Sequence, residues 1–317
     1  MAVNNSLVAK KNQKMGITAY LTADAVKNQI NSVVGGKDGQ KFISAIVSAV
    51  NTNPTLQECT NQSILSAALL GESLKLSPSP QLGHYYMVPF NDKERGKVAT
   101  FQLGYKGYIQ LAIRSGQYKK INVIAVKEGE LEYFDPLNEE IKINLMIDKW
   151  DEREAAPTIG YYAMFELTNG FRKALYWSKN QMMTHADKYS PAFSKDATVV
   201  KGKYGDKTKV SFADYEAGNY DPKDAWMYSS FWYRDFDGMA YKTMLRQLIS
   251  KWGIMSIEMQ NAFENDMTFT QEDGTVSYVE NEADVIDMEQ LEPTEEQPPV
   301  TEEQPTQDVQ AALFGNN

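Results

Sequence analysis

The stretch FQLGYKGYIQLAIRSGQYKKINVIAVKEGELEYF, residues 101–134, carries the pattern that decides the fold. Its periodicity is helical from Tyr105 to Ser115, and Gly116 then suits a left-handed C-cap. Two short β-branched runs, Ile121–Val126 and Leu131–Phe134, follow around a Glu-Gly turn and predict a β-hairpin. A single helix between extended segments predicts a domain that mixes α and β structure.

Two further hairpins are expected on either side of this stretch. The strand pairs are His84–Phe90 with Val98–Leu103, around the polar turn 91–96, and Ile159–Leu167 with Phe171–Trp177, around Thr168-Asn169-Gly170. Asn-Gly is a strong hairpin signal because both residues tolerate positive φ.

Helical patterns occupy both ends of the expected domain. The N-terminal patterns start after Thr22, Asp38 and Asn61, each able to cap a first turn. The C-terminal helices are expected at Lys179–Lys188, Ala225–Tyr233, Phe236–Trp252 and Ile257–Phe263, with a long polar loop over 190–224. On the longest helix the expected apolar face comprises Phe236, Met239, Ala240, Leu245, Leu248, Ile249 and Trp252, with Gly253 as the C-cap. Helices, then hairpins, then helices predict an α+β fold.

Charge is distributed unevenly along the chain. The formal net charge is −10, from 32 Lys and Arg and 42 Asp and Glu. Residues 256–317 hold 16 of the acidic residues and none of the basic ones, which leaves 26 acidic against 32 basic residues elsewhere, near +6. A basic body with an acidic tail is typical of proteins that bind a polyanion. A solubilising tail on an ordinary domain explains the same numbers.

Composition divides the chain into three parts. We expect a flexible polar arm over residues 1–16, a folded domain over 17–266, and a disordered acidic tail over 267–317, rich in Glu, Pro, Gln and Thr. The arm lacks the apolar region of a secretory signal, and no apolar run approaches the roughly 18 residues of a membrane-spanning helix. We therefore expect a cytoplasmic protein.

The sequence contains few of the residues on which enzymes depend. Cys59 is the only cysteine, which excludes an intrachain disulfide and multi-cysteine zinc sites; we expect it to be half-buried and inert. His84 and His185 are the only histidines and lie a hundred residues apart, so each is best explained by a satisfied hydrogen bond. P-loop, GxGxxG and GxSxG motifs are absent. We expect no cofactor and no metal, and we assign no catalytic residue.

Carboxylates leave one enzymatic alternative open, a metal-dependent DNA nuclease. Asp235 and Asp237 flank Phe236, where negative charge also suits the start of a helix. A second acidic group comprises Asp148, Asp151, Glu152 and Glu154, and it alternates with Lys149 and Arg153 as in a solvated turn.

Basic and aromatic side chains combine on two expected helices in the way that single-strand binding requires. Lys106, Gln110 and Arg114 recur every four residues, within about 80° of one another around the helix axis. Lys242 and Arg246 form a polar stripe on the long helix. Further aromatic and basic residues nearby are Tyr241, Trp252, Phe171, Arg172, Lys173, Lys119 and Lys120. Each basic residue could equally be a solvated surface cation, and each aromatic residue could belong to the core. This pattern alone therefore does not decide whether the protein binds nucleic acid.

Five segments, in order and with sensible spacing, resemble one family. They are LGHYYMVPF (82–90), the stretch 101–134, NGFRKALYWSKNQM (169–182), HADKYS (185–190) and FDGMAYKTMLRQLISKWGIMSIEMQ (236–260). Together they resemble the RecT family of phage recombinases, with a likeness over about residues 20–265. The arm, the Lys-rich loop and the acidic tail are not closely covered.

The resemblance implies binding of single-stranded DNA and ATP-independent annealing of complementary strands in phage homologous recombination. It implies a small antiparallel β-sheet with a crossing helix, homo-oligomers in the form of rings or helical filaments, and DNA in a basic groove along the oligomer. A 5′→3′ exonuclease of the RecE type is the implied partner, and a host single-stranded-DNA-binding protein is a further candidate.

The resemblance also implies site residues. Lys106, Gln110 and Arg114 match the family's YKG…R helix, and Lys242 and Arg246 match its KT-x-LR helix, so DNA backbone contacts are expected there. Secondary candidates are Gln102, Tyr105, Lys120 and Arg172. Two alternatives to an annealing protein stay open: a metal-dependent DNA nuclease, and a structural or interaction protein that does not anneal DNA.

Overall fold

The computed structural model describes residues 15–35, 38–92, 95–201, 205–270 and 276–278, with only the backbone of 269–270 and 276–278. One unit comprises residues 1–198 and 208–284, and a second comprises 199–207 and 285–317. The expected arm lies outside the described residues up to residue 14, and so does the tail from residue 279.

The N-terminal part is helical, as expected. It contains α1 (Ile17–Thr22), α2 (Asp24–Val34), α3 (Gly39–Thr52), the 3₁₀ helix η1 (Pro54–Glu58) and α4 (Asn61–Ser73). The expected caps are wrong: α2 and α3 begin without a side-chain cap, and α4 is capped by Thr60, whose Oγ1 accepts from Ser63 N at 3.3 Å. Helices α1 and η1 were not expected, because six and five residues are too few to show a period.

The first hairpin is confirmed. β1 (Tyr85–Asp92) pairs antiparallel with β2 (Gly96–Leu103), from Tyr85 opposite Leu103 to Asp92 opposite Gly96. The chain returns to this sheet after the helices: β10 (Thr268–Thr270) pairs with β2, and β11 (Val276–Tyr278) pairs with β10. Paired strands therefore continue past residue 266, into the segment expected to be tail.

A second sheet has the order β3-β6-β7, from β3 (Tyr118–Lys127), β6 (Thr158–Leu167) and β7 (Arg172–Ser178). The β6–β7 hairpin is confirmed, with Gly170 at φ +89° in its turn. The hairpin expected around Glu128-Gly129 is wrong, because β3 pairs with β6 and not with the next strand. A five-residue partner could not satisfy the backbone of ten-residue β3, whereas β6 matches its length.

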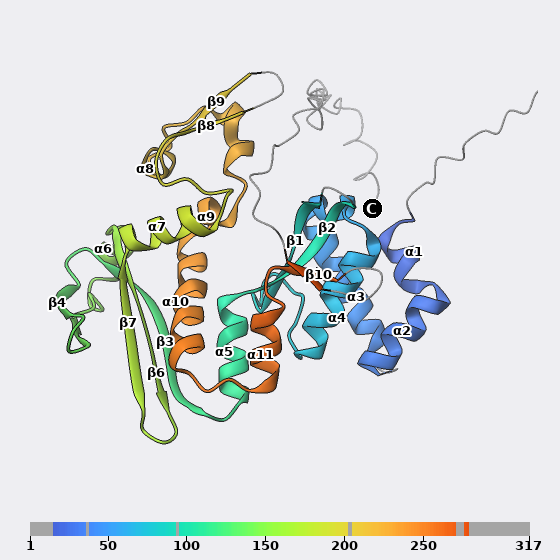
Figure 1. Cartoon of the computed structure of the whole chain (residues 1–317), viewed down its shortest axis with the longest axis horizontal. Coiled ribbons are helices and arrows are strands. Elements are labelled where there is room, and N and C mark those ends of the chain that lie inside the picture. The colour runs from blue at the N-terminus through green and yellow to red at the C-terminus, as the bar shows by residue number, and fades with distance from the viewer. Residues whose placement is uncertain (1–14, 36–37, 93–94, 202–204, 271–275, 279–317) are drawn as a thin grey trace, which may run out of the picture. The chain divides into compact units, whose positions relative to one another are not determined.

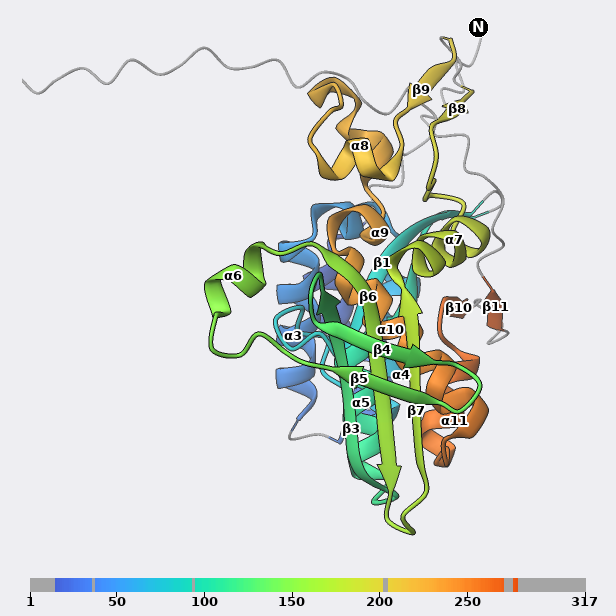
Figure 2. The ribbon, with the colours of Figure 1, turned by 90° about the vertical axis from the view of Figure 1, so that its left-hand side faces the viewer.

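The next strand instead forms a small hairpin of its own. β4 (Leu131–Asp135) pairs with β5 (Glu140–Ile143) and crosses the outer face of the β3-β6-β7 sheet (Figure 2), where Phe134 meets Tyr176 edge-on at 5.1 Å. Helix α6 (Trp150–Ala155) follows. Its Arg153 forms a two-pronged ion pair with the fully buried Glu130, at 2.6 and 3.2 Å, and so ties α6 to the base of the hairpin.

The inner face of the same sheet is covered by a crossing helix. Helix α10 (Phe236–Trp252) lies between the β3-β6-β7 sheet and α5 (Tyr105–Arg114), with α11 (Ile257–Glu264) against the far side of α5 (Figure 1). Asp235 caps α10 by accepting from Gly238 N at 3.0 Å. Both sides of α10 are therefore buried, and two residues of the expected apolar face lie outside the core: Met239 is partly exposed, and Trp252 is 37% exposed.

The remaining elements connect β7 to α10. Helix α7 (Lys179–Tyr189) starts at a Ser178–Gln181 capping box, and α8 (Phe212–Glu216), η2 (Pro222–Tyr228) and α9 (Phe231–Arg234) follow. Strands β8 (Thr198–Val200) and β9 (Lys207–Lys209) form a two-stranded sheet. The expected helix 225–233 is split because Ser230 caps a new start, its Oγ accepting from Trp232 N at 3.3 Å. The expected loop 190–224 contains α8, whose Phe212 stacks on Phe236 at 4.7 Å.

The mixture of helices with small antiparallel sheets confirms the α+β prediction. The thiol of Cys59 is fully buried, not half-buried as expected. Within the described ranges, no helix combines the length and the apolar character needed to cross a membrane.

Candidate nucleic-acid interface

The start of α5 is held by close backbone contact with the entry to β1. A Cβ on Gly107 would lie 2.1 Å from the carbonyl oxygen of His84, and a Cβ on Gly104 would lie 2.3 Å from that of Gly83. Gly104 N also donates to His84 O at 2.9 Å. Only glycine permits this approach, and it fixes the direction in which α5 presents its exposed face.

That exposed face carries Lys106 and, one turn later, Gln110. Tyr108, Leu111 and Ala112 are buried on the opposite side of the helix. The helix thus presents an amine and an amide to solvent from a backbone that is fixed on its inner side.

Positive charge gathers around His84 at this edge. Burial lowers the pKa of His84, and the nearby charges of Arg114 and Lys106 lower it further. The imidazole is therefore neutral at pH 7, and its Nδ1 accepts from Ser77 N at 3.3 Å. Two cationic side chains, Lys106 and Arg114, therefore lie near His84, and cations are what a phosphate site requires.

Aromatic rings adjoin Lys106. The ring of Tyr105 is partly exposed and meets Tyr241 edge-on at 5.4 Å, and the Lys106 ammonium lies 6.0 Å from the Tyr105 ring centre. Tyr241 in turn contacts Tyr161 at 6.0 Å. Burial, aided by the charge of Asp237, raises the pKa of Tyr241 to about 12, so its ring is uncharged at neutral pH. Gln102, also partly exposed, lies on β2 just before α5.

Arg114, at the far end of α5, is anchored to the protein. Its guanidinium donates to the carbonyl oxygens of Leu74 at 2.5 Å and Lys75 at 3.2 Å, which follow the end of α4. A cation at these carbonyls is favoured by the helix dipole. Arg114 therefore serves α4 in addition to any role towards DNA.

Lys242 and Arg246 surround a buried carboxylate that the sequence did not single out. Asp266, 2% exposed, accepts from Lys242 Nζ at 3.0 Å and from Arg246 Nη1 at 2.9 Å. It also accepts from Leu103 N at 2.9 Å and from the Tyr108 hydroxyl at 3.3 Å. The two cations expected at DNA thus join α10 to α5 and β2 through Asp266; the side chain of Lys242 is 10% exposed and that of Arg246 is 40% exposed. Asp266, the last residue of the expected domain, was counted only among the acidic residues of 256–317 and was given no role.

Lys120 and Arg172 lie on the outer face of the β3-β6-β7 sheet, away from α5. Each is paired in register with Glu166 on the central strand. The ammonium of Lys120 lies 3.4 Å from Glu166, which Lys119 also contacts at 2.6 Å. The structure therefore groups Gln102, Tyr105, Lys106 and Gln110 at the start of α5 and leaves the other candidates in three separate places.

Four carboxylates of the nuclease alternative have partners within the protein. Asp235 caps α10, and Asp237 accepts from the Tyr161 hydroxyl at 2.6 Å. In the second group, Glu152 pairs with Lys149, and Glu154 accepts from the Trp150 indole. Among the residues described, no three His, Cys, Asp or Glu side chains are grouped to hold a metal.

Comparison with known proteins places these features in a family context. The model of the RecT family matches residues 40–284. The uncharacterized protein YqaK of Bacillus subtilis (strain 168) is 37% identical over 309 residues, 95% of this chain and 90% of that protein. Protein RecT of Escherichia coli (strain K12) is 27% identical over 268 residues, 83% of this chain and 84% of that protein.

Proposed function

The chain belongs to the RecT family, whose members anneal single-stranded DNA in recombination, and we propose that it anneals complementary strands without ATP during phage homologous recombination. The observation that carries this proposal is the start of α5, where Lys106 and Gln110 are exposed beside Tyr105. Basic groups next to aromatic rings are what a single-strand site needs.

The proposed mechanism is physical. Cations neutralise phosphates of a bound strand and release its counterions, which makes binding dependent on salt by a slope of about 0.7 for each contact. Bases that remain accessible can then test their register against a second strand. Pairing supplies on the order of 1–2 kcal/mol per base-pair step. The reaction breaks no covalent bond, so it calls for no catalytic residue and no cofactor.

We propose Lys106 and Gln110 as the principal DNA contacts, with Tyr105 and Gln102 beside them. Arg114, Lys120 and Arg172 are proposed as additional contacts, because each is exposed. For Lys242 and Arg246 we propose a positioning role: they hold α10 against α5 through Asp266.

The wider context is also a proposal. It comprises assembly as a ring or helical filament, action in the bacterial cytoplasm beside a 5′→3′ exonuclease, and contact with a host single-stranded-DNA-binding protein.

A charge reversal at α5 tests the proposal. In Lys106→Glu, affinity for an oligo-dT strand should fall, and the slope of log affinity against log salt should decrease by about 0.7 or more. The matched control is Lys27→Glu, an exposed lysine on α2, which should bind as the unaltered protein does. Equal binding by both variants would refute the assignment of the site. Strand cleavage that requires Mg²⁺ would favour the nuclease instead.

A further inference from the structure

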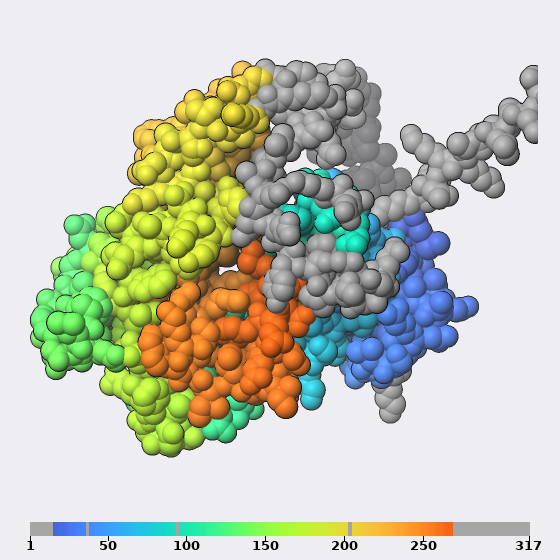
Figure 3. Space-filling view, viewed as in Figure 1, coloured from blue at the N-terminus to red at the C-terminus, as the bar shows by residue number. Residues whose placement is uncertain are grey.

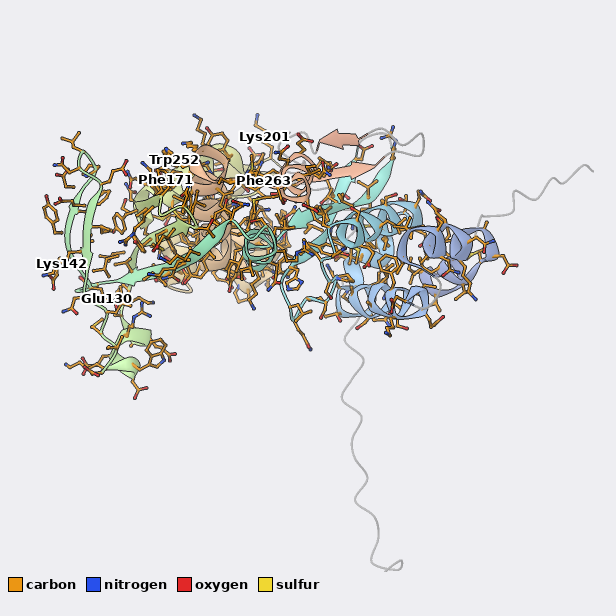
Figure 4. All side chains as sticks on the ribbon, turned by 90° about the horizontal axis from the view of Figure 1, so that it is seen from below. Glu130, Lys142, Phe171, Lys201, Trp252 and Phe263 are labelled. Atoms are coloured by element: carbon orange, nitrogen blue, oxygen red, sulfur yellow. The ribbon has the colours of Figure 1, made fainter. Side chains whose placement is uncertain are left out.

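Two large aromatic side chains remain exposed where α10 and the β6–β7 hairpin end. Trp252, the last residue of α10, is 37% exposed, and Phe171, just before β7, is 45% exposed. Figure 4 shows both side chains in the same region, and in the space-filling view the surface of α10 adjoins that of β6 and β7 (Figure 3). Exposed apolar side chains that lie together commonly mark a binding surface.

Hydrogen bonds of the turn hold the backbone of Phe171. Phe171 N donates to Asn169 Oδ1 at 3.0 Å, and Phe171 O accepts from Leu167 N at 2.8 Å, so the turn holds Phe171 in place. Its ring lies 6.0 Å from that of Phe165, a buried residue of the inner sheet face. Two residues on, Lys173 has the same side-chain direction, because side chains alternate along a strand.

Lys173 connects the two aromatic residues. Its ammonium lies 4.3 Å from the centre of the Trp252 ring, and it also forms an ion pair with Glu139. Lys251 lies 5.7 Å from the same ring centre. The Trp252 ring is thus bordered by two cationic side chains, Lys173 and Lys251, and Lys173 is two residues from Phe171.

This combination has a specific chemical meaning. A nucleobase stacks on an aromatic face, and the phosphates on either side of it are attracted to nearby cations. A protein partner would also cover exposed rings, and Ile254 close by is 42% exposed. The cations distinguish the two cases: a bare apolar partner would have to desolvate them, whereas a phosphate backbone would pair with them.

We propose that Phe171 and Trp252, with Lys173 and Lys251, form a base-stacking platform for single-stranded DNA. The platform rests on the proposed function and extends it, because it is distinct from the start of α5. Tyr105 contacts α10 at Tyr241, which is about 16 Å along the helix axis from Trp252. The chain then holds a strand at two separated places, one by charge and one by stacking.

An abasic strand separates stacking from charge. Affinity is measured for oligo-dT and for an abasic oligodeoxynucleotide of the same length, with Trp252→Ala, Trp252→Phe and Phe171→Ala. Each alanine variant should bind oligo-dT about 5- to 150-fold more weakly, the range for loss of one stacked base. Binding of the abasic strand should change less than about twofold, and Trp252→Phe should retain most of the affinity.

Trp150→Ala is the matched control. Trp150 is 54% exposed on α6, but its indole donates to Glu154 in an acidic surrounding, so its loss should leave DNA binding unchanged. Equal loss for dT and abasic strands in the Trp252 variants would overturn the platform. So would an altered oligomer size at unchanged DNA affinity, which would identify a protein interface. Failure of the unaltered protein to bind oligo-dT would instead reject the proposed function itself.

Discussion

Replacing Asp266 by asparagine should lower the free energy of unfolding by about 3 kcal/mol. The carboxylate accepts four hydrogen bonds, two of them from the cations Lys242 and Arg246. The side chain is 2% exposed, so no solvent replaces it when its charge is removed.

The magnitude follows from the exposure of the two partners. Removing one member of a buried ion pair costs about 3–5 kcal/mol, because the other charge stays buried without compensation. The side chain of Lys242 is 10% exposed and cannot recover water, whereas that of Arg246 is 40% exposed and can. Counting Lys242 alone places the loss at the lower limit, about 3 kcal/mol. The asparagine oxygen can still accept from Leu103 N, which keeps the loss from rising further.

Thermal and urea unfolding of Asp266→Asn measures the effect, with an expected decrease in Tm of about 6 to 12 °C. Asp196→Asn, at an exposed position, is the control and should leave Tm unchanged. Adding Lys242→Met to Asp266→Asn should restore part of the stability, because the stranded charge is gone. A loss below about 1 kcal/mol, or no restoration by Lys242→Met, would refute the buried network.

Three further predictions concern other parts of the fold. Gly107→Ala should destabilise the protein by about 1–3 kcal/mol through the clash with His84 O, and an unchanged Tm would contradict the close approach. Burial acts to raise the pKa of Glu130, but hydrogen bonds from Arg153 and from two backbone N–H groups lower it below 4.5. Ionised Glu130 therefore stabilises the folded protein at neutral pH, and this stabilisation is lost as the pH falls through the folded-state pKa. In Glu130→Gln, Tm should therefore depend less on pH on the acid side. Parallel curves of Tm against pH for the variant and the unaltered protein would contradict this role of Glu130. Deletion of residues 279–317 should leave annealing in vitro intact, and loss of annealing in this variant would assign the tail a direct role. Deletion of residues 267–317 also removes β10 and should lower Tm.

Local signals in the sequence were sufficient for the elements that depend on neighbours in the chain. Asn169-Gly170 predicted the β6–β7 turn, and the helical period predicted α5 and α10. The Glu128-Gly129 turn signal led to a wrong prediction of strand pairing, because pairing depends on strand length and burial as well as on the turn. In the structure the buried Glu130 joins this turn to Arg153, and β3 pairs with β6, which follows α6 in the chain.

The candidate site was predictable in one part and hidden in another. Spacing placed Lys106 and Gln110 together on the exposed face of α5. The same kind of spacing on α10 could not show that Lys242 points at Asp266, because that contact joins residues 24 positions apart through folding. The spacing of a cationic residue along a helix is the same whether its side chain contacts solvent, a phosphate or a buried carboxylate.

Annealing kinetics test the central claim most directly. Two complementary oligonucleotides with donor and acceptor dyes are mixed with the unaltered protein, without ATP and with EDTA present, and duplex formation is followed by energy transfer. The account predicts that the protein accelerates duplex formation under these conditions and leaves the strands intact. Duplex formation at the rate of the strands alone would contradict it.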